Sequence, residues 1–306
     1  KEILQTVHKD IEQGSSFSDA LAKHKLVFSS MLINMVRAGE KAGILNEELD
    51  RVANLLEKDL ETTEKIKTAT RYPIVVIFSL GVAFTILMVF VIPQFAKFFS
   101  AFKAELPLPT RILIGANFII QNYWYLILGS AAALGYGFNR VLATEKGRHG
   151  WDMLILRTPV FGPLFLKIFL SRFARMLAAM LRSGIPILEA LSITAATVNN
   201  KVISKAIVEM REKVSQGKSL TEPMKASRVF PTIAISMVSI GEKAGSLEHM
   251  LNKVSDYFDR ESDYTIKNLT PLIEPMLIFG LGFIVLIFAL GIFMPMWDLI
   301  NVYKNY

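Results

Sequence analysis

Two long stretches without a charged residue constrain this chain more than any other feature of its sequence. They are Pro73–Phe95 and Pro275–Trp297, each 23 residues long. An α-helix needs about 20 consecutive apolar residues to cross the hydrocarbon core of a bilayer. Hydrophobic residues make up 52% of the chain, above the roughly 45–50% of soluble domains, and the excess is concentrated in these stretches. The sequence therefore predicts an integral membrane protein with helical spans.

A third uncharged stretch, Ile112–Phe138, is less uniform. It contains Asn117, Gln121 and Asn122, and its residues 123–125 (Tyr-Trp-Tyr) resemble an aromatic belt at a membrane interface. Small residues recur four apart, at Gly129, Ala133 and Gly137. This spacing allows close helix–helix approach, although such residues can equally have no partner. We therefore predict three spans, at residues 73–95, 112–138 and 271–297.

Basic residues near the span ends predict the orientation. Ten of them lie beside the spans in residues 1–72 and 139–270, against four in residues 96–111 and 298–306. Cytoplasmic segments carry the excess of Lys and Arg. We expect two cytoplasmic domains (1–72 and 139–270), a periplasmic loop (96–111) and a periplasmic tail (298–306). The N-terminus is then cytoplasmic and the C-terminus periplasmic.

The sequence also contains an internal repeat at an offset of 202. VRAGEKAG at Val36–Gly43 matches VSIGEKAG at Val238–Gly245. The same offset pairs Pro73 with Pro275 and Pro93 with Pro295. A stretch from about Thr158 to Asn200 has no counterpart in the first copy, so we expect the first domain to be N-terminally incomplete.

The two domains read as helical, and we see no convincing strand. Leu45–Lys67 and Leu247–Lys267 place apolar residues at helical spacing, with charges on the opposite face. Short connections between amphipathic helices favour antiparallel bundles. The predicted fold class is all-α, with three transmembrane helices and two homologous cytoplasmic bundles. Further helices are expected at Lys1–Gln13, Ser30–Ala38, Lys167–Ser183, Ile187–Val198 and Val202–Gln216.

The doubled GEKAG motif supplies the first candidate site residues. They are Gly39, Glu40 and Gly43 in one copy, and Gly241, Glu242 and Gly245 in the other. A structural interpretation makes each motif a turn between helices, with Gly at the C-terminal cap and Glu pairing with a base or a backbone amide. The alternative is that Glu contacts a partner protein directly.

The ends of the spans supply further candidates. Glu274 lies between two prolines at the mouth of the third span, where an ionisable residue is a candidate functional group. The candidates at the membrane interface are Pro73, Pro93, Glu274, Pro275 and Pro295. The candidates for helix packing are Gly129, Ala133 and Gly137.

Nothing in the sequence predicts catalysis or a cofactor. Cys is absent, and the four His residues are isolated without metal-ligand spacing. Gly217-Lys218-Ser219 resembles the end of a phosphate loop, but position 212 is Glu and no strand precedes it. A helix start capped by Ser explains it better. We predict no catalytic, metal or cofactor site, and no nucleic-acid partner.

The doubled turn, followed each time by an amphipathic helix and a span, resembles the type II secretion F-protein and type IV pilus platform family. So do Pro159–Pro163 (PVFGP), Ser183–Leu191 (SGIPILEAL) and Phe90–Phe95 (FVIPQF) followed by Ala104–Pro107 (AELP). These last two stretches look closest to the pilus branch. The resemblance covers nearly the whole chain.

The resemblance implies a non-catalytic inner-membrane platform. Such proteins form dimers or larger homo-oligomers and lie above a hexameric cytoplasmic ATPase. They are thought to transmit its motion to major and minor pilins in the membrane, during assembly and in some cases retraction, together with other inner-membrane pilus components. The alternatives left open are a platform for type II secretion or DNA uptake, a membrane receptor, and a transporter. Against a transporter, the spans lack charged midplane residues.

Overall fold

The computed structural model describes residues 2–94 and 108–304. The described residues form helices and connecting turns without a strand, so the predicted all-helical class is confirmed. The chain divides into two compact units. One comprises residues 2–65 and 142–265, and the other comprises 66–141 and 266–304. The expected loop at 96–111 lies mostly outside the described residues, as does the AELP motif at 104–107.

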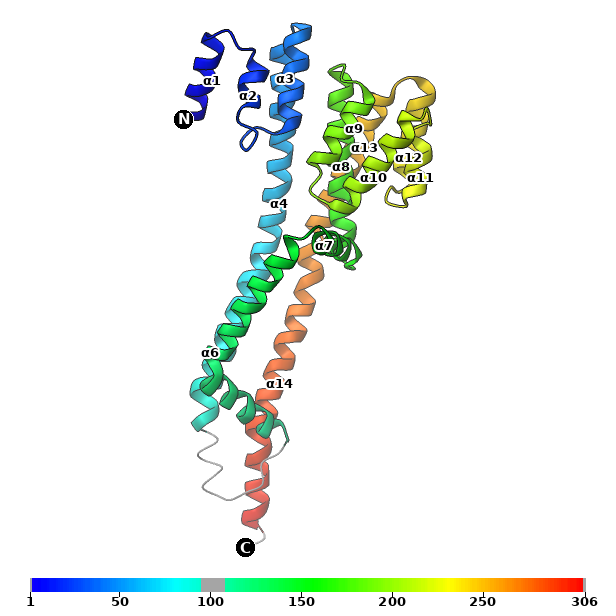
Figure 1. Ribbon diagram of the computed structural model, residues 1–306. Helices are drawn as coiled ribbons and strands as arrows, with labels where there is room; N and C mark the ends of the chain where they lie inside the picture. The colour runs from blue at the N-terminus through cyan, green and yellow to red at the C-terminus, as the bar shows by residue number, and fades with distance from the viewer. Residues whose placement is uncertain (1, 95–107, 305–306) are drawn as a thin grey trace. The chain divides into compact units, whose positions relative to one another are not determined.

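The described residues of the first unit form eleven helices or parts of helices, which Figure 1 labels. Short breaks separate them, with Gly in the left-handed region at Gly14, Gly43, Gly184, Gly217 and Gly245. The helices are α1 (Glu2–Glu12), α2 (Phe17–Ala22), α3 (Ser30–Ala42), the start of α4 (Leu45–Ile86), α7 (Glu145–Arg157), α8 (Phe161–Arg182), α9 (Ile187–Thr197), α10 (Lys201–Ser215), α11 (Thr221–Ser227), α12 (Thr232–Ala244) and most of α13 (Leu247–Lys267).

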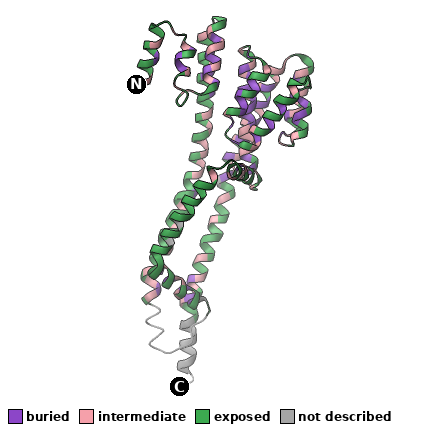
Figure 2. Cartoon of the chain, viewed as in Figure 1, coloured by how far each residue is buried: buried purple, intermediate pink, exposed green. Residues whose placement is uncertain are grey.

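Helix α8 lies at the centre of the core of this unit. Its residues Phe173, Leu177 and Met180 are buried, and the Phe173 ring packs against Phe230 with centroids 5.3 Å apart. Figure 2 shows the buried residues gathered over α8 to α13. Residues of the first sequence copy join the same core, through Met31, Met35, Val52 and Leu55. The sequence did not predict this shared core, because periodicity identifies an apolar face but not the face it packs against.

Several helix limits differ from those expected. Helix α3 runs four residues beyond Ala38, and α8 begins at Phe161 rather than Lys167. Short helices α2 and α11 were not predicted, because six or seven residues give too little periodicity to recognise. Helix α7 was also missed; Asp152 is its one residue classed as buried. Its apolar face is weak, so its sequence resembles a loop.

The second unit contains the rest of α4, the π-helix η1 (Leu87–Val91), α6 (Leu108–Leu142) and α14 (Leu269–Lys304). Helix α4 continues through Pro73 to Ile86, so the expected boundary at residue 72 is not a helix end. The core of this unit is small. Met88, Ile92, Leu113 and Phe288 are buried together, with Phe84 and Phe288 in edge-to-face contact at 5.6 Å.

In the described parts of the chain, two continuous helices are long and apolar enough to cross a membrane, Leu45–Gln94 and Leu247–Met294. Two bent pairs raise the number to at most four. In one pair, Thr110–Leu126 and Leu128–Leu142 meet at 51°, and Tyr123 has non-helical backbone angles. The other pair is α7 and α8, whose buried residues belong mostly to the core of the first unit. Figure 2 shows that the helices of the second unit are largely exposed, as expected for surfaces facing lipid.

Candidate functional site: the two GEKAG turns

The first GEKAG turn connects α3 to α4. Gly43 ends α3 in the left-handed region, with φ of 73°, where Gly carries no steric penalty. The backbone N–H of Ile44 donates to the Gly39 carbonyl at 2.9 Å, which closes the helix end. A Cβ at Gly39 would lie 2.8 Å from Glu48 Cγ and 3.2 Å from Leu45 Cα. Gly39 therefore permits the close crossing of the two helices.

The second turn repeats this geometry between α12 and α13. Gly245 has φ of 64°, and the N–H of Ser246 donates to the Gly241 carbonyl at 2.9 Å. A Cβ at Gly241 would lie 2.9 Å from Met250 Cβ and 3.0 Å from Leu247 Cα. The first Gly of each motif is needed for close approach, and the last for the helix cap.

The Glu of each motif caps a neighbouring short helix. Glu40 Oε1 accepts from the backbone N–H of Phe17 at 2.5 Å, and Oε2 accepts from Ser18 at 3.0 Å. These are the first N–H groups of α2, which have no partner within the helix. A carboxylate at this position also interacts favourably with the helix dipole.

Glu242 does the same for α11 and makes one more contact. It accepts from the backbone N–H groups of Leu220 and Thr221, the latter at 3.1 Å, and from the Thr221 hydroxyl. The Gly217–Ser219 segment, which resembles the end of a phosphate loop in sequence, lies one residue before α11. The Glu242 carboxylate thus occupies the place where a phosphate would meet the amides of α11. Ser219 Oγ accepts from the N–H of Glu222 at 3.3 Å.

The two turns differ in the residue packed beneath the first Gly. In the second turn it is Met250. In the first it is Glu48, which is fully buried. Glu48 pairs with Arg51 and accepts from the Ser183 hydroxyl, at the turn between α8 and α9. Sequence analysis did not single out Glu48. The signal available was that Glu replaces Met at the equivalent position, 202 residues apart.

Cavities border both turns. One of about 350 Å³ lies between α3 and the start of α9, and its polar lining includes Arg37, Lys41 and Glu189. Another of about 390 Å³ adjoins Glu242, Lys243 and Lys225. Both have mixed charge and are open to solvent. Within residues 2–94 and 108–304, no three His, Asp or Glu side chains form a group able to hold a metal ion.

Ion pairs connect the long helices that follow the two turns. Lys65 Nζ lies 2.9 Å from both Glu61 and Asp263, which are 202 residues apart in the sequence. Hydrogen bonds from Lys58 and Lys65 lower the pKa of Glu61 to about 2, and the bond to Asp263 raises the pKa of Lys65.

A second ion pair connects α4 to α8, where Arg172 pairs with Asp59 at 2.6 Å. Burial raises the pKa of Asp59, against the opposing effect of Arg172 and Arg175.

The other predicted site residues lie in the second unit. Pro73 is buried within α4, whereas Glu274 and Pro275 are exposed in the first turns of α14. Pro93 lies two residues after the end of η1, and Pro295 lies within α14. The side chain of Pro295 lies outside the described part of the structure.

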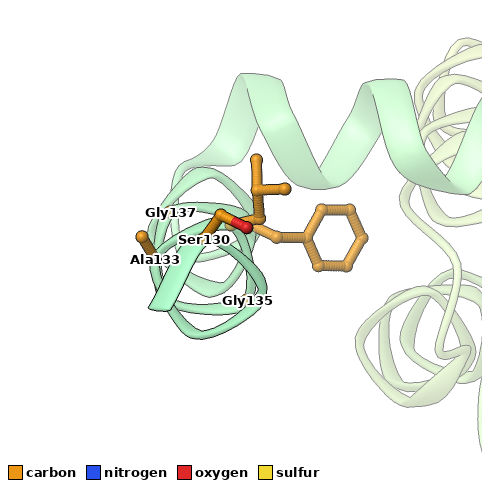
Figure 3. Close-up of a pocket in the computed structure, with 6 residues that line it drawn as sticks. Ser130, Ala133, Gly135 and Gly137 are labelled. Atoms are coloured by element: carbon orange, nitrogen blue, oxygen red, sulfur yellow. The ribbon is translucent and has the colours of Figure 1, made fainter. Parts of the chain in front are cut away.

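The small residues of α6 face open space within the chain. A Cβ at Gly129 or Gly137 would meet no described neighbour within 4 Å. An apolar hollow of about 960 Å³ is lined by this segment of α6, including Ala133 and Gly135 (Figure 3). The described residues of this chain therefore do not supply a helix that packs against this face.

Comparison with known proteins now places the chain. The family model described as "Type II secretion system (T2SS), protein F" matches residues 1–93 and 173–295. Each matched segment contains one GEKAG turn, and the segments end at Pro93 and Pro295. The chain belongs to this family. The resemblance inferred from the sequence is confirmed.

Named relatives of this family member come from both branches. It is 42% identical to the type IV pilus assembly protein PilC of Thermus thermophilus, over 98% of this chain and 74% of the relative. It is 38% identical to PilC of Myxococcus xanthus, over 98% of this chain and 72% of the relative. A type II secretion system protein F of Aeromonas hydrophila is 31% identical, over 98% of this chain and 78% of the relative.

Proposed function

We propose that this chain is an inner-membrane platform protein for type IV pilus assembly. The observation that carries the proposal is the match to relatives named for pilus assembly, at 38–42% identity over 98% of the chain. It couples a cytoplasmic hexameric ATPase to the insertion of major and minor pilins, and in some systems to their retraction. It works with other inner-membrane pilus components, as a homo-oligomer, without a nucleic-acid partner and without catalytic activity of its own.

Three spans and a cytoplasmic N-terminus complete the proposed arrangement. The later part of α4, the bent helix α6 and the apolar part of α14 form the spans. The apolar side chains exposed on them support this assignment, since lipid would cover them. The excess of basic residues beside the first unit supports a cytoplasmic location for it. The C-terminus is then periplasmic.

We further propose that the two halves are copies of one duplicated unit. The equal cap geometry at Gly43 and Gly245 supports this, as do the carboxylate contacts of Glu40 and Glu242. The structural roles of these residues favour an interpretation of GEKAG as a folding motif. Partner contacts then belong to the exposed surfaces around it.

A type II secretion platform is the second candidate. It is favoured by the 31% identity to a type II secretion system protein F over 98% of this chain. The mechanics would be the same, with pseudopilins in place of pilins. The greater identity to pilus assembly proteins places pilus assembly first.

Photocrosslinking in native membranes tests the proposal. A photoreactive residue replaces Phe78 in the first span, Phe279 in the third, or Ile240 in α12, all of which are exposed. The membrane positions should capture a pilin, and position 240 a motor ATPase. Matched controls at the buried residues Phe288 and Val238 should capture neither.

The captured species separates the candidates. Pilins support the first candidate, and pseudopilins support the second. Capture of neither class, with the protein folded and the parent machinery expressed, would overturn the platform assignment and favour a membrane receptor.

A further inference from the structure

Pro93 leaves one carbonyl of the first span without its normal helical donor. In an α-helix, the N–H of residue 93 would donate to the carbonyl of Val89, but proline has no N–H. The π-helix η1 lies at this point. The N–H of Ile92 donates to the carbonyl of Leu87, five residues earlier, rather than to the carbonyl four residues earlier as in an α-helix. Gln121 of α6 approaches the freed group, and its Nε2 donates to the Val89 carbonyl at 3.4 Å.

The same situation recurs in α14. Residue 295 is proline, so the carbonyl of Gly291 also lacks its normal donor. The Thr110 hydroxyl of α6 donates to this carbonyl at 2.7 Å, and both residues are buried. Val89 and Gly291 are 202 residues apart, the offset that relates the two GEKAG motifs. Two equivalent carbonyls thus accept from the same helix.

The two donors lie on one face of α6. Thr110 and Gln121 are 11 residues apart, which is close to three whole turns and about 16 Å along the axis. Asn117 falls between them on the same face and is also buried. The stripe ends at Tyr123, where α6 bends. Two of the three polar residues that made the second span irregular in sequence, Asn117 and Gln121, therefore lie at helical spacing from Thr110.

We propose that Thr110 and Gln121 form a polar clasp, in which α6 compensates the two proline breaks and so holds the first and third spans in fixed positions. A carbonyl freed by proline needs another donor, and it costs free energy if it is buried without one, so a donor from the neighbouring helix α6 stabilises each break. Thr110 and Gln121 are positioning residues. The consequence for pilus assembly rests on the proposed function, but the clasp itself does not.

A double-mutant cycle on the purified full chain in lipid nanodiscs tests the clasp. Thr110→Val should raise the equilibrium constant for unfolding about five- to ten-fold, given the strength of side-chain hydrogen bonds between membrane helices. Pro295→Ala restores the missing N–H, so the same Thr110→Val change should then have little effect. Gln121→Leu should cost about two- to three-fold, because its contact is longer, and Pro93→Ala should cancel that cost.

The crossed pairs provide the matched control. Thr110→Val with Pro93→Ala, and Gln121→Leu with Pro295→Ala, should be additive, because those residues do not share a bond. Asn122→Leu removes a contact within α6 alone, between Asn122 and the Phe118 carbonyl, and should not couple to either proline. Thr110→Ser keeps the hydroxyl and should retain wild-type stability.

Two readouts keep the clasp and the function apart. Coupling confined to the matched pairs establishes the clasp, whereas additivity in all four pairs overturns it. Surface pili are then counted in cells at equal protein levels. Fewer pili with Thr110→Val, and normal numbers with Thr110→Ser, would show that assembly needs the clasp. Coupling without any change in pili would leave the clasp established and refute its role in assembly.

Discussion

The two GEKAG turns are alike where the backbone sets the requirement and different where the surroundings do. Both place Gly at a close helix crossing, Glu on the first amides of a short helix, and Gly at a left-handed cap. Beneath the first Gly, however, one turn has Met250 and the other has Glu48, which contacts Ser183. The motif is thus a folding device used twice, and the neighbours of each copy decide what it contacts.

Removal of the capping carboxylates should have the largest effect. Glu242→Ala loses three hydrogen bonds and Glu40→Ala two, so we expect costs of about 4 and about 3 kcal/mol in the local stability of α11 and α2. Hydrogen exchange of the amides at residues 17, 18, 220 and 221 measures this cost. Glu222→Ala is the control, because the Glu222 side chain forms an exposed pair with Lys218. Equal costs for Glu242→Ala and the control would contradict the capping role.

Adding a methyl group at the helix crossings should rank second. Gly241→Ala places its Cβ 2.9 Å from Met250 Cβ and 3.0 Å from Leu247 Cα, and we expect a loss of about 2–3 kcal/mol. Gly39→Ala meets Glu48 Cβ at 2.9 Å but Leu45 Cα only at 3.2 Å, so its cost should be about 2 kcal/mol. Thermal unfolding of the full chain measures both changes. Gly150→Ala in α7 meets open space and should not destabilise. A larger loss of stability for Gly39→Ala than for Gly241→Ala would contradict this prediction.

Making the first turn resemble the second should have a smaller effect. Glu48→Met removes the buried carboxylate but fills its volume, as Met250 does. Arg51 would still pair with Glu47, at 3.3 Å, and it remains partly exposed to solvent. We therefore expect the free energy of unfolding to change by about 1 kcal/mol or less. Glu48→Ala adds a cavity and should cost about 3 kcal/mol. The two unfolding midpoints test this, and equal losses would show that the charge matters more than the packing.

The smallest expected effect is the pH dependence of the ion pairs that Lys65 forms with Glu61 and Asp263. The pKa of Glu61 is lowered from 4.5 to about 2, so its stabilising contribution is present above about pH 4.5 and is lost as the pH falls toward 2. Glu61→Gln should therefore unfold at a lower temperature than the wild type at pH 6 and at the same temperature near pH 2. Raised salt should narrow the gap at pH 6, because these groups are exposed. A gap that persists at pH 2 would exclude ionisation as its cause.

Most helices of this protein, and its family, could be predicted from the amino-acid sequence. Uncharged stretches predicted membrane helices, because the bilayer sets the length of an apolar span. Helical periodicity gave most helices of the first unit, and the doubled turn gave the family. The last Gly of each GEKAG motif was also interpretable as a helix cap, since left-handed caps favour Gly. The close crossing at the first Gly was not predicted.

The contacts between these helices could not be predicted from the sequence. Glu48 looked like one more charge on an amphipathic helix, and its burial depends on Ser183, 135 residues away. Gln121 made the predicted second span irregular, and Thr110 fell in the predicted loop before that span. Their roles became visible only when Val89 and Gly291 were found beside them. Periodicity records which face of a helix is apolar or polar, but not which distant group meets it. A hydrogen bond between distant residues leaves no local pattern, so it becomes visible only once the chain is folded.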